Sequence, residues 1–238
     1  MSADLRGVDS HGVARLMGYL QLYEKKRINA KPQLRIVHDT PSTALVDGDA
    51  SMGLFSGPYA MRLAIEKAKK VGTGWVAVKN SNHYGIAGYH AMMALKEDCI
   101  GISMTNASPL VAPTFAKERL LGTNPISIAI PAGEEPPFVA DMATTTAANG
   151  KLEILQRKNE SAPLGWLQDK EGNVIDLTQE QYTVNNVYNC REGGKKIKPC
   201  GLSWGVKTRN IAFITAKELT NNESLYSPSS FCYNYYRT

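Results

Sequence analysis

The chain has 238 residues, enough for one large domain or two small ones. Apolar residues make up 43% of it and charged residues 21%, which excludes a mainly disordered or fibrous protein. The net charge of +5 includes no polybasic cluster, so we expect no nucleic-acid partner. No apolar run approaches the ~18 residues of a membrane span, and the N-terminus MSADLRGVDSHG lacks the apolar core of an export signal. We therefore expect a cytoplasmic protein with no membrane partner.

Up to about residue 172, the sequence predicts alternating helices and strands. Residues 58–71 carry apolar side chains at helical spacing and end at a Gly-Thr-Gly turn. The apolar run 75–78 predicts a strand, and the polar stretch 81–85 predicts a loop. The pattern continues with a helix over 86–96, a strand over 100–104, a loop over 106–109, and strands over 125–131 and 138–141. This alternation is typical of an α/β layer architecture.

After residue 173 the alternation stops. Residues 173–238 hold eight Asn and six of the eleven Tyr, and only 210–215 show a regular period. Three of the four cysteines, Cys190, Cys200 and Cys232, lie here at spacings that match no zinc motif, so we expect free thiols and no metal. We expect a poorly specified C-terminal tail, aberrant or disordered, that contributes little packed core. The alternative is a divergent small domain.

The densest polar cluster is DSHGVAR at 9–15. If a helix begins near Ser10, His11 and Arg15 share one face. Arginine can grip a carboxylate with two parallel hydrogen bonds, and histidine can exchange a proton with a carbinol oxygen. The pattern therefore suits a 2-oxo or 2-hydroxy carboxylate, although an ordinary helix cap with an exposed His and Arg would look the same.

Three further polar motifs lie next to predicted strands. NSNHYG at 80–85 lies between a strand and a helix, where α/β proteins place ligand-binding loops, although it could also be a capped turn. GTNP at 122–125 and DMATTT at 141–146 flank strands, and their Asp and Thr side chains could bind ribose or phosphate or only form turns. Of the other histidines, we expect His38 at the surface and His90 inside a helix, either packed or facing solvent.

Several common catalytic motifs are absent from the sequence. There is no GxGxxG and no GxxxxGK[ST], so a Rossmann dinucleotide site and a P-loop are unsupported. There is also no HExxH and no GxSxG, which argues against a zinc protease and an α/β-hydrolase.

Taken in order, DSHGVAR (9–15), NSNHYG (80–85), GTNP (122–125) and DMATTTAANGK (141–151) resemble the malate/L-lactate dehydrogenase family of the sulfolactate-dehydrogenase type. That family is unrelated to the Rossmann dehydrogenases. The resemblance covers residues 4–172 and implies a mixed α/β, non-Rossmann NAD(P)-binding fold, here truncated. It implies that 1–90 form the N-terminal part of a dimer-forming and substrate domain and 91–172 a partial NAD(P)-binding domain, followed by the tail at 173–238.

The resemblance also implies a homodimeric oxidoreductase that interconverts small 2-oxo and 2-hydroxy acids with NAD or NADP. Ser10 and His11 match the family's serine–histidine pair, while Arg15 and Thr123 match its substrate-binding residues. His83 matches a proton-transferring histidine of some members, so His11 and His83 compete for the acid–base role. Cofactor contacts are implied for His83, Tyr84, Gly85, Ile86, Ala87, Ser108, Asp141, Met142 and Ala143.

Two departures from the family pattern leave other interpretations open. The family has a further helical stretch before the first motif and continues for well over a hundred residues beyond 172, so this chain resembles a fragment cut at both ends. Lys151 also stands where some members have an aspartate in a charge relay. The chain could accordingly be a catalytically inactive fragment, or the same scaffold could act on an imine or a ureidoglycolate-type substrate.

Overall fold

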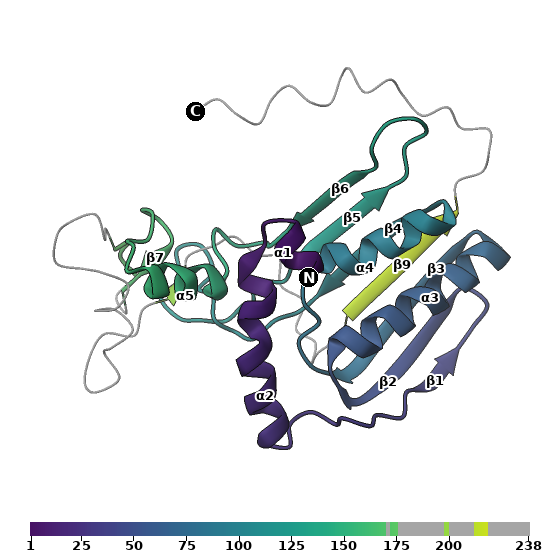
Figure 1. Cartoon of the computed structure of the whole chain (residues 1–238), viewed down its shortest axis with the longest axis horizontal. Helices are drawn as coiled ribbons and strands as arrows, with labels where there is room; N and C mark the ends of the chain where they lie inside the picture. The colour runs from purple at the N-terminus through teal and green to yellow at the C-terminus, as the bar shows by residue number, and fades with distance from the viewer. Residues whose placement is uncertain (170–171, 176–197, 200–211, 219–238) are drawn as a thin grey trace.

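The computed structural model describes residues 1–169, 172–175, 198–199 and 212–218. The largest element of the described part is a seven-stranded sheet with the order β1-β2-β3-β9-β4-β5-β6 (Figure 1). The strands are β1 (Arg35–Asp39), β2 (Thr43–Ser51), β3 (Thr73–Ser81), β4 (Cys99–Thr105), β5 (Ile126–Ile130), β6 (Phe138–Met142) and β9 (Ala212–Glu218). Strands β2 and β3 run parallel, and the other neighbours in this sheet run antiparallel. The expected mixed α/β architecture is confirmed.

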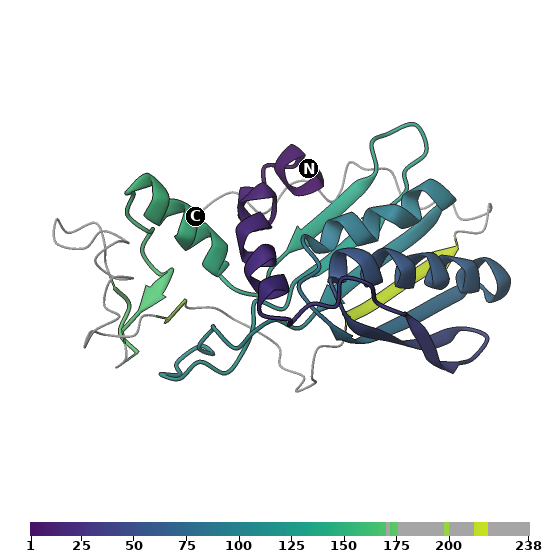
Figure 2. The same cartoon turned by 60° about the horizontal axis from the view of Figure 1, so that its bottom comes forward.

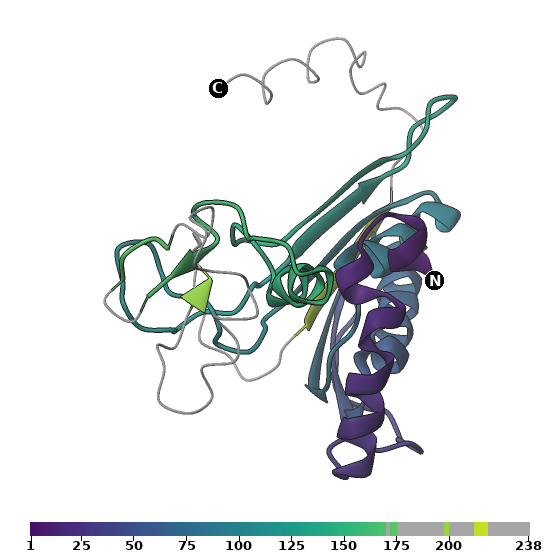
Figure 3. The same ribbon diagram turned by 60° about the vertical axis from the view of Figure 1, so that its left-hand side comes forward.

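Helix α3 (Gly53–Val71) connects the two parallel strands and covers the sheet (Figure 3). Its apolar stripe, which includes Met61, Ile65 and Ala68, is buried against Val76 and Val78 of β3. The sequence places the start of this helix at residue 58, but the helix begins five residues earlier and contains Pro58. Removal of these side chains from water is the main stabilising contribution, at roughly 1.5–3 kcal/mol for each large one.

Helix α4 (Ala87–Met93) continues into a 3₁₀ turn (Ala94–Glu97) and lies beside α3 on the same face of the sheet. His90, inside α4, is fully buried, and His38 is exposed on β1, so the surface position of His38 and the packed alternative for His90 are confirmed. The imidazole Nε2 of His90 is 2.9 Å from the Tyr84 carbonyl oxygen.

Strand β9 occupies the middle of the sheet. It pairs antiparallel with both β3 and β4, with Ile214 opposite Val76 and Ser103. The expectation that the tail contributes little packed core is therefore wrong for Ala212–Glu218, where two neighbouring strands supply the backbone hydrogen bonds. This strand overlaps 210–215, the one stretch of the tail whose sequence shows a regular period. The three tail cysteines lie outside the described residues.

The remaining elements lie beside the sheet. Helices α1 (Ser2–Leu5) and α2 (Leu16–Glu24) precede it, and α2 lies between the sheet and α5 (Asn149–Lys158) in both views (Figures 1 and 2). Strands β7 (Leu167–Gln168) and β8 (Lys198–Pro199) pair in a separate two-stranded sheet. Residue 90 lies within α4, and strands from both sides of it share the large sheet; the division into domains stays a prediction.

No helix in the described part of the chain is long and apolar enough to cross a bilayer.

Candidate functional site

The first motif does not form the continuous helix that the sequence suggests. Residues Asp9–His11 and Val13–Arg15 form two 3₁₀ turns, separated by an extended Gly12, and α2 begins only at Leu16. His11 and Arg15 are instead both fixed by Ser10. The Ser10 Oγ is 2.8 Å from His11 Nδ1, and Arg15 Nε donates to the Ser10 carbonyl at 2.7 Å. Ser10 is buried, so these two contacts orient the histidine and the arginine together.

His83, in the loop after β3, stacks on His11. The ring centroids are 5.4 Å apart, and the planes are inclined by 25°. Burial, the adjacent His11 and the positive Arg15 lower the pKa of His83 to about 4. Burial and Arg15 also lower the pKa of His11, although Asp141 and Glu153 oppose that shift. Both rings are therefore neutral near pH 7, and His11 is the easier one to protonate because negative charges face it.

Tyr19 of α2 completes this group and is absent from the sequence-based prediction. Its hydroxyl lies 2.8 Å from His83 Nδ1, and the two ring centroids are 5.7 Å apart. Tyr19 is four residues beyond Arg15, one helical turn along, and this spacing is the signal that could have indicated it.

Arg15 also forms an ion pair that the sequence did not reveal. Its Nη2 contacts Glu153 Oε2 on α5, and the other Glu153 oxygen accepts a hydrogen bond from Asn149 Nδ2 at 2.8 Å. The first turn of α5 lies close to this pair, because a Cβ on Gly150 would be 2.9 Å from Ser10 Cβ and 3.0 Å from Arg15 Nη2. The segment 141–151 thus meets the segment 9–15, a contact that the sequence did not predict.

Asp141, at the end of β6, connects the fourth motif to the second. Its Oδ2 accepts a hydrogen bond from the Gly88 N–H at 2.8 Å, and burial raises its pKa. Its second oxygen, Oδ1, has no hydrogen bond to another described residue and could accept one from a ribose hydroxyl. Met142 and Ala143 beside it are exposed. This carboxylate oxygen and the exposed segment beside it are groups that could hold a dinucleotide cofactor.

The third motif is joined to the same region through its backbone. The Thr123 carbonyl accepts hydrogen bonds from the Thr144 N–H at 2.9 Å and from its hydroxyl at 3.1 Å. Asn124 Oδ1 accepts from the Ala107 N–H at 3.0 Å, and the neighbouring Ser108 is exposed. These contacts tie the loops around 107, 123 and 144 together.

The side chains of the 84–87 loop face inward. Tyr84, Ile86 and Ala87 are all buried, and the Tyr84 ring stacks on His90 at 4.6 Å. Burial raises the pKa of Tyr84 further above its ordinary value. Any ligand at this loop can therefore meet backbone atoms of 84–87 but not these three side chains, whereas His83 remains partly accessible.

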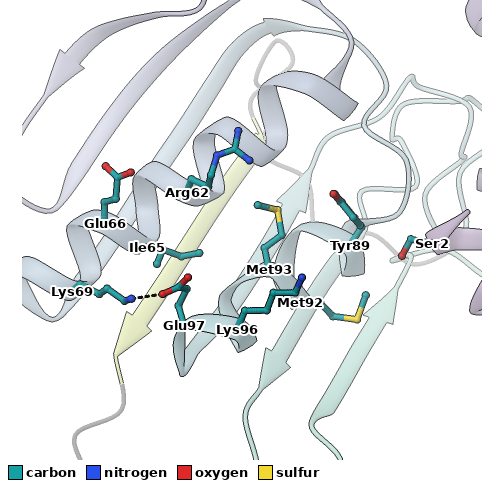
Figure 4. Close-up of a pocket in the computed structure, with 10 residues that line it drawn as sticks. All are labelled: Ser2, Arg62, Ile65, Glu66, Lys69, Tyr89, Met92, Met93, Lys96 and Glu97. Atoms are coloured by element: carbon teal, nitrogen blue, oxygen red, sulfur yellow. Dashed lines mark hydrogen bonds and ion pairs between the residues drawn. The ribbon is translucent and has the colours of Figure 1, made fainter.

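One cavity of the structure lies away from the histidine pair, and another lies beside it. One of about 680 Å³ lies between α3 and α4, is lined by residues such as Arg62, Ile65 and Met93, and contains none of the predicted site residues (Figure 4). A second cavity of about 530 Å³ includes Tyr19 and Phe55. Within the described ranges, no group of three or more His, Cys, Asp or Glu residues could hold a metal ion.

Comparisons with known proteins agree with this assembly of motifs. The family model described as malate/L-lactate dehydrogenase matches residues 1–203. The malate dehydrogenase of Pyrococcus abyssi (strain GE5 / Orsay) is 52% identical over 180 residues, which are 76% of this chain and 49% of that protein. The ureidoglycolate dehydrogenase (NAD(+)) of Escherichia coli (strain K12) is 34% identical over 170 residues, covering 71% of this chain and 49% of the relative.

A solved structure extends the comparison to the fold. The sulfolactate dehydrogenase of Methanocaldococcus jannaschii superposes with a TM-score of 0.72 at 36% sequence identity, covering 91% of this chain and 68% of that one. The chain spans about half the length of the curated relatives it matches. The family model, the relatives and the superposed fold all give one answer: the chain belongs to the malate/L-lactate dehydrogenase family.

Proposed function

We propose that the protein interconverts small 2-oxo and 2-hydroxy acids with NAD or NADP. The observation that carries this proposal is the stacked pair of His11 and His83 beside Arg15. A proton donor and a cation that binds the carboxylate are the groups that reduction of a 2-oxo acid needs from a protein. Family membership and the dehydrogenase names of the relatives support the same reaction.

Arg15 is the residue that would bind the substrate carboxylate. Its Nε is already held by the Ser10 carbonyl, which fixes the plane of the guanidinium. Its Nη2 pairs with a carboxylate, Glu153 Oε2, and a 2-oxo acid carries the same chemical group, which supports this role. The substrate carboxylate would take the place of Glu153. Thr123 would line the same site.

His11 would transfer the proton. In the reduction, His11 gives a proton to the oxygen of the substrate carbonyl, becomes neutral and recovers a proton from solvent. When bound, NADH or NADPH supplies the hydride that C2 of the 2-oxo acid accepts, which completes a balanced two-electron reduction. Ser10 orients His11 through Nδ1, and Asp141 and Glu153 favour its protonated form.

The cofactor would lie along the exposed segment that begins at Asp141. Asp141 Oδ1 would accept from a ribose hydroxyl, while Met142 and Ala143 would contact the cofactor beside it. Ser108 and the backbone of 83–87 would provide further contacts.

A second copy of the chain is the expected partner. Leu16, Met17 and Leu20 on α2 are exposed, and no residue of α2 is buried. An apolar helix face of this kind is typical of a surface that another subunit covers. Because α2 also carries Tyr19, association of two chains would occur next to the histidine pair.

The direct test is oxidation of reduced nicotinamide by the full chain. Purified protein is mixed with NADH or NADPH and a panel that includes oxaloacetate, pyruvate, a sulfonated 2-oxo acid and a cyclic imino acid, with loss of nicotinamide absorbance as the readout. Ureidoglycolate with the oxidised cofactor tests the reverse direction. Turnover with a 2-oxo acid that is lost in His11→Asn supports the proposal. Binding of cofactor without turnover on any substrate would identify a catalytically inactive family member and contradict it.

A further inference from the structure

Two hydrogen-bond donors converge on one nitrogen of His83. The backbone N–H of Gly85 donates to Nδ1 at 3.2 Å, and the Tyr19 hydroxyl lies 2.8 Å from the same atom. A backbone amide can only donate, so Nδ1 must present its lone pair and carry no proton. The Tyr19 hydroxyl must then donate as well. Burial raises the pKa of Tyr19, which keeps its proton available at neutral pH.

The geometry points to Tyr19 as a positioning residue that, with the Gly85 amide, holds His83 in the neutral form whose proton is on Nε2. The only N–H that His83 can offer to a substrate oxygen is then Nε2–H. His83 polarises the substrate carbonyl through this hydrogen bond, and His11 remains as the proton donor. The role toward substrate rests on the proposed function, whereas the protonation state of the ring does not.

Three groups next to His83 favour its neutral ring. His11 stacks on it from the first 3₁₀ turn, Arg15 adds a positive charge from the second, and Tyr19 donates to it from α2. None of these groups is negative. A protonated ring would need Nδ1–H, which would face the Gly85 N–H and the Tyr19 O–H, so hydrogen bonding to the neutral form adds to the effect of burial.

The contact between Tyr19 and His83 also joins α2 to the loop after β3. Tyr19 and His83 are 64 positions apart in the sequence, and their rings are inclined by 44°. The Tyr19 hydroxyl is thus the link through which the position of α2 sets the orientation of the imidazole. A change at Tyr19 should alter the histidine itself rather than only the stability of the fold.

Nitrogen-15 NMR of the full chain, labelled at histidine, tests this directly. The protein has only four histidines, so His11→Asn, His38→Asn, His83→Asn and His90→Asn variants assign each ring by loss of its signals. We expect His83 to give the Nε2–H pattern, with no titration between pH 6 and 8. Tyr19→Phe should give a mixture of the two neutral forms and a higher pKa. The matched control is Tyr23→Phe, one turn further along α2, which should leave the His83 signals unchanged.

Kinetics separate a positioning role from a purely structural one. In Tyr19→Phe we expect kcat to fall about tenfold, the loss of roughly one hydrogen bond, with KM changed less than twofold. A wild-type His83 in the Nδ1–H form, or one that titrates near its ordinary pKa, would overturn the inference, and this measurement needs no variant to fold. Unchanged His83 spectra in a folded Tyr19→Phe would overturn it too. If the chain shows no turnover, the spectra alone decide the protonation state, so failure of the proposed function is distinguished from failure of this inference.

Discussion

Arg15 and Glu153 lie 138 positions apart in the sequence and form an ion pair next to the histidine pair. The guanidinium is held on one edge by the Ser10 carbonyl and on another by this carboxylate. Both side chains are about a quarter exposed, so the pair is neither a deeply buried bridge nor a free surface contact. Glu153 thus occupies the position that we assign to the substrate carboxylate.

Replacing Glu153 by Gln should lower KM for the 2-oxo acid. The amide keeps an oxygen that can accept from Asn149 but removes the negative charge that competes for Arg15. An ion pair that solvent still reaches is worth about 0.2–1 kcal/mol, so KM should fall by up to about fivefold with little change in kcat. Initial rates at a series of substrate concentrations measure this. Glu160→Gln, an exposed position just beyond α5, is the control. A KM that stays the same or rises in Glu153→Gln would show that Glu153 does not compete.

Replacing Arg15 by Lys should have the opposite effect. Lysine keeps the charge but loses the planar group that forms two parallel hydrogen bonds with a carboxylate. We expect KM for the 2-oxo acid to rise about tenfold or more, while the Kd of the reduced cofactor, measured by fluorescence, stays constant. Arg27→Lys, at an exposed position after α2, should behave like the wild type. An unchanged KM in an active Arg15→Lys protein would exclude Arg15 from the substrate site.

The pH dependence should differ between the two directions of the reaction. Oxidation of a 2-hydroxy acid needs neutral His11 as a base, and the lowered pKa keeps this ring neutral through pH 7. The rate should therefore hold a plateau at neutral pH and fall only below the ordinary histidine pKa of about 6.5. Reduction needs protonated His11, so its rate should increase as pH falls toward that lowered pKa.

The assignment of His11 as acid and base is checked with the two histidine variants. His11→Asn should lose roughly 10²–10⁴ in kcat and also its pH dependence. His83→Asn should lose kcat but keep the profile that His11 imposes. The reverse result, with the profile lost only in His83→Asn, would assign proton transfer to His83.

Much of the sheet could be predicted from local pattern alone. Apolar runs at 75–78, 100–104 and 125–131 correspond to β3, β4 and β5, because strands buried on one or both faces leave a strong local signal. The conformation of residues 9–15 could not be predicted in this way. The spacing in this segment is compatible with a helix, but the extended Gly12 divides it into two short turns, and hydrogen bonds to Ser10 replace the helix as the reason that His11 and Arg15 lie together.

Some residues of the candidate site could likewise be predicted from local sequence, and others could not. His11, His83 and Arg15 could be identified from local motifs, because each stands in a polar cluster at the edge of a predicted element. Glu153 could not, because its partner Arg15 lies 138 positions away, and the local signal for Tyr19 is limited to its spacing of four residues from Arg15. Strand β9 illustrates the same limit. The period at 210–215 sets this segment apart in the tail, but its place between β3 and β4 depends on pairing that the local sequence does not show.

The last prediction concerns that strand. Ile214→Pro removes the backbone N–H at a position that pairs with Val76 of β3 and Ser103 of β4, and proline is not tolerated inside a central strand. We expect the free energy of unfolding in urea to fall by at least about 1–3 kcal/mol, the cost of a buried backbone group left without a partner. Ile214→Val keeps the N–H and a β-branched side chain, so it should cost much less. Hydrogen exchange in the wild type should protect the amides of Ala212–Glu218 as strongly as those of β3. If Ile214→Pro were as stable as the wild type and these amides exchanged freely, β9 would not be part of the sheet, and β3 and β4 would have to obtain their inner-edge hydrogen bonds from another segment.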